Sequence, residues 1–126
     1  MFTVKTSIKP SKIHGMGVFL EENVVKNQKL WEFNPRFDLL FSVDEVENMC
    51  ESTKELIKFY GYLDKQQFNG WHVFHSGNDR FTNHSDMPNT IPYKLEDCQY
   101  MMIASKDMNI GEELTCDYNE YEIRNF

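Results

Sequence analysis

The chain is poor in cysteine and has no long apolar run, and both absences narrow the kind of protein it can be. Its three cysteines, Cys50, Cys98 and Cys116, are an odd number without C-x-x-C spacing, which argues against a disulfide framework and a zinc knot. No apolar stretch approaches the ~18 residues that a membrane helix needs. The N-terminus lacks the basic and apolar regions of a secretory signal. We therefore expect free thiols in a cytoplasmic or nuclear protein that does not enter a membrane.

Basic residues are also in the minority. Lys and Arg number 13 against 20 Asp and Glu, which gives a formal net charge of −7. Because no Lys/Arg cluster is visible, direct binding to nucleic acid is not expected. An acidic protein attracts basic partners, although the same charge also keeps a small domain soluble. The charge therefore permits a lysine-rich protein partner without identifying one.

The histidines do not suggest a metal site. His72 and His75 are three residues apart in a segment with the pattern of a strand, where odd spacing places side chains on opposite faces. Since the cysteines add no ligand pattern, we expect no bound metal.

The residue pattern predicts a mainly β chain with one helical insert. A chain of 126 residues suffices for one domain with a real core, and no repeat or linker divides it. Short runs bounded by turn residues predict the strands. They cover residues 3–8, 18–22, 29–33, 71–75, 93–95, 99–105 and 114–118.

The helical insert is expected from about residue 43 to residue 60. Ser42 followed by Glu45 forms a capping-box pattern, and Gly61 suits the end of the helix. Apolar residues recur with the spacing of one buried helix face. They are Val43, Val46, Met49, Cys50, Leu56, Ile57 and Tyr60.

Three short motifs stand out from this background. Residues 80–89 read Arg-Phe-Thr-Asn-His-Ser-Asp-Met-Pro-Asn, and residues 110–118 read Ile-Gly-Glu-Glu-Leu-Thr-Cys-Asp-Tyr. Alone, the first would be a loop bonded to its own backbone, and the second a turn with solvated glutamates that enters a strand. The third motif, Gly-Met-Gly-Val-Phe, occupies residues 15–19.

Together the three motifs resemble those of the SET-domain family, whose known members methylate protein lysines. The resemblance implies a SET fold of several short β-sheets, with a helical insert and a C-terminal knot-like crossing of the two polar motifs. It implies a protein-lysine N-methyltransferase that uses S-adenosyl-L-methionine and acts on a basic protein such as a histone. The alternative is a SET-fold module that binds the cofactor or a partner without catalytic activity.

The resemblance also assigns roles to individual residues. Tyr118 matches the catalytic tyrosine, whose hydroxyl would align the reacting groups. The substrate channel would contain Tyr60, Tyr62 and Cys116. The expected cofactor-binding residues are Gly15, Met16, Gly17, Arg80, Phe81, Asn83, His84 and Tyr121.

No strong general base is expected among these residues. Burial and the neighbouring sulfonium would both lower the pKa of the lysine amine. Asp117 and Glu112 are therefore expected to be structural.

The chain departs from many family members near its C-terminus. Asp86 stands where they carry a zinc-binding cysteine, and no cysteine follows Cys116, so we expect neither a pre-SET module nor a zinc-binding post-SET module. Residues 1–126 are then expected to form a minimal, stand-alone SET domain of the bacterial or viral type. A second copy of the chain could complete the channel, and on this basis we expect a homodimer.

Overall fold

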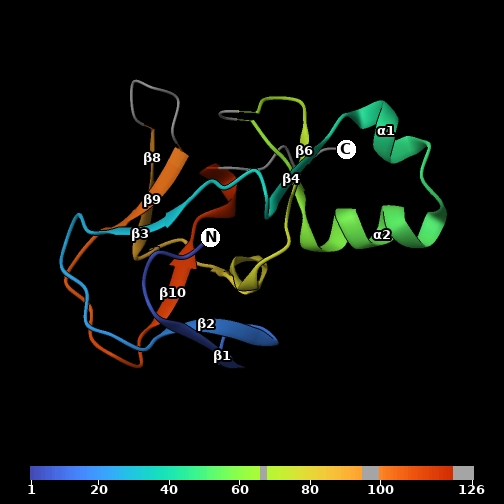
Figure 1. Cartoon of the computed structure of the whole chain (residues 1–126). Coiled ribbons are helices and arrows are strands. Elements are labelled where there is room, and N and C mark those ends of the chain that lie inside the picture. The colour runs from blue at the N-terminus through green and yellow to red at the C-terminus, as the bar shows by residue number, and fades with distance from the viewer. Residues whose placement is uncertain (66–67, 95–99, 121–126) are drawn as a thin grey trace.

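The computed structural model describes residues 1–65, 68–94 and 100–120, and its short strands form three small sheets with two helices at one end (Figure 1). This arrangement confirms the mainly β fold expected from the sequence. None of the helices among the described residues is long and apolar enough to cross a membrane.

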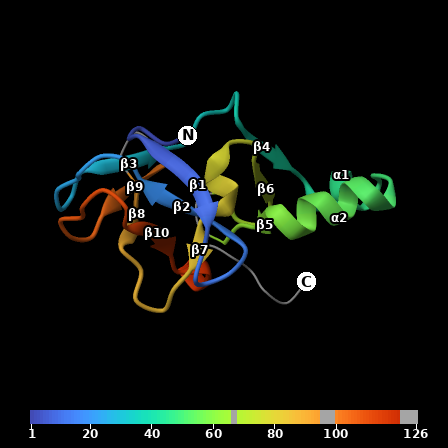
Figure 2. The same ribbon diagram turned by 90° about the horizontal axis from the view of Figure 1, so that it is seen from below.

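The first sheet joins parts of the chain that are far apart in sequence. Its strand order is β1 (Thr6–Pro10), β2 (Met16–Leu20), β10 (Glu113–Cys116) and β7 (Asn83–His84). Strand β10 pairs antiparallel with β2 and parallel with β7. All three motifs therefore meet in adjacent strands, which lie side by side in Figure 2.

The other two sheets have three strands each. One has the order β3 (Lys29–Glu32), β9 (Tyr100–Ala104) and β8 (Thr90–Lys94). The other has the order β4 (Asp38–Phe41), β6 (His72–His75) and β5 (Tyr62–Leu63). Strands β4, β5 and β7 were not predicted, and β8 begins earlier than the predicted segment 93–95.

The predicted continuous helix is in fact two helices, α1 (Val43–Glu47) and α2 (Glu51–Tyr60). The expected cap is present, because Ser42 Oγ accepts the Glu45 N–H at 3.0 Å. The break follows from local bonding: the Asn48 side chain donates to the Asp44 carbonyl at 2.9 Å, and Cys50 is extended and begins α2.

The predicted buried face of the helical segment is only partly buried. Val46 and Ile57 are the buried residues of the two helices. Leu56 is 47% exposed and Tyr60 is 37% exposed. The helices therefore contact the sheets through few side chains, and much of their apolar surface faces solvent or the pocket described below.

The main core lies between the first and second sheets. Its buried members come mostly from β2, β3, β9 and β10, and they are Val18, Leu20, Val24, Leu30, Ala104, Met108 and Leu114. A second cluster of Trp31, Tyr100, Met102 and Cys116 packs beside it. This second cluster forms one wall of the candidate site.

Candidate active site

The Asn83 side chain links the glycine motif to the C-terminal motif through hydrogen bonds. Its Nδ2 donates to the carbonyls of His14 and Met16 at 3.0 and 3.1 Å, and to Glu113 Oε2 at 2.9 Å. Glu113 also accepts a hydrogen bond from Ser11 Oγ at 2.8 Å. Glu113 is therefore bonded within the protein and is not the solvated glutamate that its segment alone would suggest.

The two positions of the first motif that carry glycine require it for different reasons. Gly15 has φ +47°, a left-handed conformation that favours glycine, and open space lies where a side chain would stand. A side chain at Gly17 would instead collide with the carboxylate of Glu113. Met16, between them, is 42% exposed. The open surface of this motif thus lies at Gly15 and Met16.

His84 holds the backbone of Tyr118. Its Nδ1 accepts the Tyr118 N–H at 3.0 Å, and its Nε2 lies 2.9 Å from Asp86 Oδ1. An acceptor at Nδ1 requires the neutral ring to carry its proton on Nε2, which then donates to Asp86. His84 therefore positions the residue expected to be catalytic.

The hydroxyl of Tyr118 is held as firmly as its backbone. It donates to the Thr82 carbonyl at 2.6 Å, a short hydrogen bond for this pair of groups. Because its proton is directed at Thr82, the Tyr118 hydroxyl can meet any further hydrogen-bond partner only as an acceptor.

A pocket with aromatic walls opens beside Tyr118. Its walls include Trp31, Phe59, Tyr60, Tyr62, Tyr100 and Tyr118. Cys116 and Arg80 also line it, so the structure gathers the three predicted channel residues around Tyr118. The pocket has a volume of about 120 Å³, similar to engineered cavities of roughly 150 Å³ that bind benzene. A slim side chain fits a space of this size.

The predicted cofactor-binding residues are divided between this pocket and the adjoining sheet. Arg80 lines it, with its guanidinium carbon 4.8 Å from the centre of the Phe81 ring and 5.8 Å from that of Tyr60. Asn83, His84 and the glycine motif are on the adjoining sheet instead. Tyr121 lies outside the described residues.

The sequence profile of the SET domain matches residues 15–119. The chain belongs to the SET-domain family. No curated protein matches it.

Two solved structures share the fold of this SET domain. One is a Plasmodium falciparum protein assigned as a histone methyltransferase, with a TM-score of 0.60 and 21% identity over 92% of this chain and 94% of that one. The other is a chain in an active polycomb repressive complex 2, with a TM-score of 0.68 and 21% identity. That match covers 91% of this chain but 15% of the longer one.

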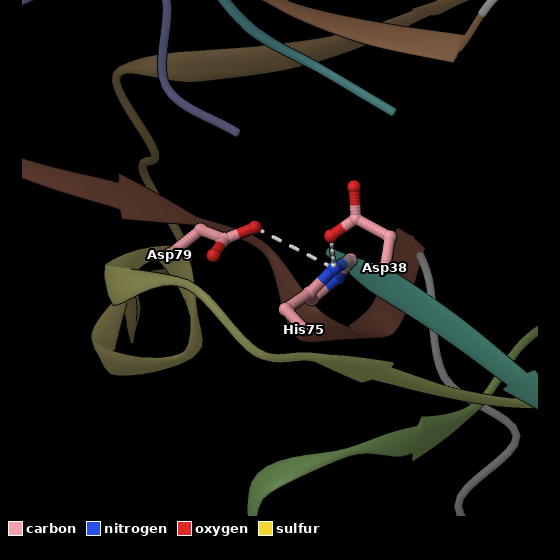
Figure 3. A group of neighbouring side chains, drawn as sticks. All are labelled: Asp38, His75 and Asp79. Atoms are coloured by element: carbon pink, nitrogen blue, oxygen red, sulfur yellow. Dashed lines mark hydrogen bonds and ion pairs between the residues drawn. The ribbon is translucent and has the colours of Figure 1, made fainter. Parts of the chain in front are cut away.

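Sequence reasoning missed a buried group of charged residues behind the pocket of this SET domain. His75 Nδ1 lies 2.7 Å from Asp38 Oδ1 and 3.5 Å from Asp79 Oδ2, as Figure 3 shows. The Trp31 indole N–H donates to Asp79 Oδ2 at 2.6 Å. His75 and Asp79 line the pocket, whereas Asp38 is 2% exposed behind it.

The pKa of Asp38 lies below its ordinary value. Burial raises this pKa, but hydrogen bonds from the His75 ring and the Asn34 N–H, together with the nearby charges of His75 and the N-terminal amino group, lower it by more. Asp38 is therefore an ionised carboxylate that accepts a hydrogen bond from the His75 ring. The β4–β6 register, which places Asp38 opposite His75, could not be read from a strand that the pattern did not predict.

Asp38, His75 and Asp79 could also hold a metal ion, because their ligand atoms lie within 4.8 Å of one another. The 2.7 Å contact between Nδ1 and Oδ1 is the length of a direct hydrogen bond, so we interpret them as a hydrogen-bonded triad. His72 is 2% exposed and does not line the pocket. Its pKa is lowered, mainly by burial.

Two further groups near the pocket are biased towards their neutral forms. Burial raises the pKa of the Tyr100 hydroxyl, with nearby carboxylates adding to the effect. Burial and the neighbouring Asp117 carboxylate raise the pKa of Glu120. Tyr100 therefore stays protonated and contributes an apolar ring and a hydroxyl to the wall.

Proposed function

We propose that this SET domain is a protein-lysine N-methyltransferase that uses S-adenosyl-L-methionine and acts on a basic protein such as a histone. The observation that carries the proposal is the Tyr118 hydroxyl, held by the Thr82 carbonyl at 2.6 Å at the edge of a pocket with aromatic walls. The assignment of one similar structure as a histone methyltransferase also supports it.

The residues of the first sheet fit the proposed cofactor. The open surface at Gly15 and the exposed Met16 would accept an adenosyl group, with backbone contacts from Asn83 and His84. Arg80, exposed at the pocket edge, would pair with the carboxylate of its amino-acid part. When bound, the cofactor supplies an electrophilic methyl group on a sulfonium centre.

Tyr118 and the pocket walls would align the lysine amine. Because the Tyr118 proton is donated to Thr82, its oxygen can accept an N–H of the incoming amine. The rings of Tyr60 and Tyr62 would contact the aliphatic part of the lysine side chain. These walls exclude water, which strengthens the polar contacts inside, and alignment supplies much of the rate in a displacement of this kind.

A cationic substrate suits the charge around the pocket. Asp79 lines it, and the whole chain has a net charge of −7. Such a surface attracts a basic segment and speeds its encounter with the protein.

The test is transfer of a labelled methyl group to histones and lysine peptides by the wild type, Y118F and Y93F. Removing the positioned hydroxyl should lower kcat by about 10²-fold or more, the order found when one such group is removed from a reaction centre. Tyr93 is 48% exposed on β8, so Y93F controls for loss of a tyrosine hydroxyl as such. Equal transfer by Y118F and the wild type would contradict the role of Tyr118.

The second candidate function is a module that binds a cationic side chain without transferring a methyl group. It is favoured by the aromatic walls and Asp79, since aromatic faces bind alkylammonium groups through cation–π contacts. Calorimetry with the cofactor, a lysine peptide and a trimethyl-lysine peptide separates the two functions. Binding with no transfer by the wild type across a broad panel of substrates would favour the module.

A further inference from the structure

A continuous hydrogen-bonded path leads from the pocket to a buried carboxylate. The Tyr62 hydroxyl, on the pocket wall, lies 3.0 Å from His75 Nε2. On the other side of the ring, His75 Nδ1 lies 2.7 Å from Asp38 Oδ1 (Figure 3). None of the sequence motifs contains these three residues.

The partners determine which nitrogen carries the proton when the His75 ring is neutral. In that form Nδ1 carries the proton and donates it to the ionised Asp38 carboxylate. The Nε2 lone pair then faces Tyr62 and accepts the Tyr62 O–H. A hydroxyl group is both a donor and an acceptor, so the Tyr62 oxygen can take up one proton as it gives up its own.

We propose that Tyr62 and His75 form a proton relay that takes one proton from the substrate ammonium before methyl transfer. This inference rests on the proposed function. The ammonium N–H gives its proton to the Tyr62 oxygen as the Tyr62 hydroxyl proton passes to His75 Nε2. The amine keeps the electron pair of the broken N–H bond and becomes the nucleophile, and His75 becomes an imidazolium. His75 returns to neutral by losing a proton to water.

A relay would give the substrate ammonium proton a route out of a pocket from which water is excluded. A lysine amine has an ordinary pKa of about 10.4, so near pH 7 only about one molecule in 10³ is neutral. From the sequence, burial and the sulfonium were expected to make a base unnecessary. Lowering the pKa does not move the proton, however, and an aromatic-walled pocket needs a route for it to leave.

Charged and titratable groups face His75 from several elements. They are Asp38 on β4, Tyr62 on β5 and Asp79 on η1 (Asn78–Phe81), with the Trp31 ring of β3 at 5.3 Å. The α-amino group of Met1 lies 3.6 Å from Asp38 Oδ2. The two carboxylates stabilise the imidazolium that the relay forms, as a carboxylate does for the histidine of a Ser-His-Asp triad.

The test is the pH dependence of kcat for the wild type, H75Q and Y62F. Near pH 7, each variant should lose about 10²-fold or more, the usual contribution of general acid–base catalysis. The deficit should shrink as pH approaches ~10.4, where the lysine amine is neutral in solution. H72Q is the matched control, since His72 is in the same strand but does not line the pocket, and it should keep the wild-type pH profile.

Three results would overturn the relay. A deficit that stays constant from pH 7 to pH 10 in H75Q and Y62F would mean that these residues only shape the pocket. Equal pH profiles for Y62F and the wild type would exclude Tyr62 as the group that passes the proton to His75. This result would count even if H75Q failed to fold. Loss of wild-type activity on dialysis against a metal chelator would assign the triad to a metal ion. A wild type that transfers no methyl group at any pH would instead contradict the proposed function.

Discussion

Tyr118 is held at both ends by the motif that precedes it by more than thirty residues. His84 Nδ1 accepts its N–H, and the Thr82 carbonyl accepts its hydroxyl proton. Each contact fixes a different atom, so the side chain cannot swing to another χ1 rotamer without losing the hydroxyl contact. The catalytic role expected for Tyr118 depends on this restraint as much as on the residue type.

Cys50 is predicted to be the more reactive of the two described cysteines. Hydrogen bonds from the Thr53 hydroxyl and backbone lower the pKa of its thiol to about 7, and Cys50 is exposed whereas Cys116 is buried. Because the thiolate is the nucleophile, alkylation of Cys50 by iodoacetamide should rise with pH around a midpoint near that pKa. Mass spectrometry of peptides quenched at short times measures this.

The matched control for this prediction is T53A. It removes the hydroxyl 3.1 Å from Cys50 Sγ and should move the alkylation midpoint upward, towards the ordinary thiol value of about 8.5. Faster labelling of Cys116 than of Cys50, or an unchanged midpoint in T53A, would count against the account.

At the scale of single residues, the sequence predicts what lies inside motifs and little else. His84 and Tyr118 lie side by side, as the resemblance of their motifs to the SET family implied. The bond between Glu113 and Asn83 could not be derived from either segment, because the two residues are 30 apart in sequence. The pairing of Asp38 with His75 depends on the register of β4 against β6, which no local pattern encodes.

Among the elements, the helical pair shows how weakly periodicity predicts burial. The apolar spacing around residues 43–60 is helical, but the chain breaks between α1 and α2 at residues 48–50. Ile57 is 3% exposed, whereas its neighbour Leu56 is 47% exposed. Propensity and capping thus predicted helix, and tertiary packing decided which side chains are buried.

This difference gives a direct test of how α2 is attached to the sheets. I57A should lower the free energy of unfolding by about 2–5 kcal/mol, because it removes buried methylene groups and leaves a cavity. L56A, at an exposed position, should change it by no more than about 0.5 kcal/mol. Urea unfolding followed by circular dichroism measures both, and similar losses for the two variants would contradict the packing described.

The very short strands could not have been predicted. Strands β5 and β7 have two residues each, too few for any alternation of apolar and polar side chains. β7 exists because β10 supplies its partners, with Thr115 opposite Asn83 and Cys116 opposite His84. Such strands are set by tertiary contacts, whereas the longer strands β2, β3, β6, β9 and β10 follow from their own sequences.

For the whole molecule, one sheet gathers three motifs that span about a hundred residues of sequence. The open surface at Gly15 and Met16 lies on that sheet. The aromatic pocket is lined mainly by residues of the other two sheets and α2, with Cys116 contributed by β10. Tyr118 joins the two regions. It lines the pocket, while its N–H donates to His84 and its hydroxyl donates to the Thr82 carbonyl. The homodimer expected from the sequence stays a prediction.

The central claim is that the aromatic pocket receives the lysine side chain while the cofactor binds on the adjoining sheet. A crystal structure with S-adenosylhomocysteine and a lysine peptide tests it most directly. The account predicts the lysine amine within about 3 Å of the Tyr118 or Tyr62 hydroxyl, with the nucleoside beside Gly15 and Met16. Density for the nucleoside inside the aromatic pocket, or a lysine amine bound outside it, would contradict the account.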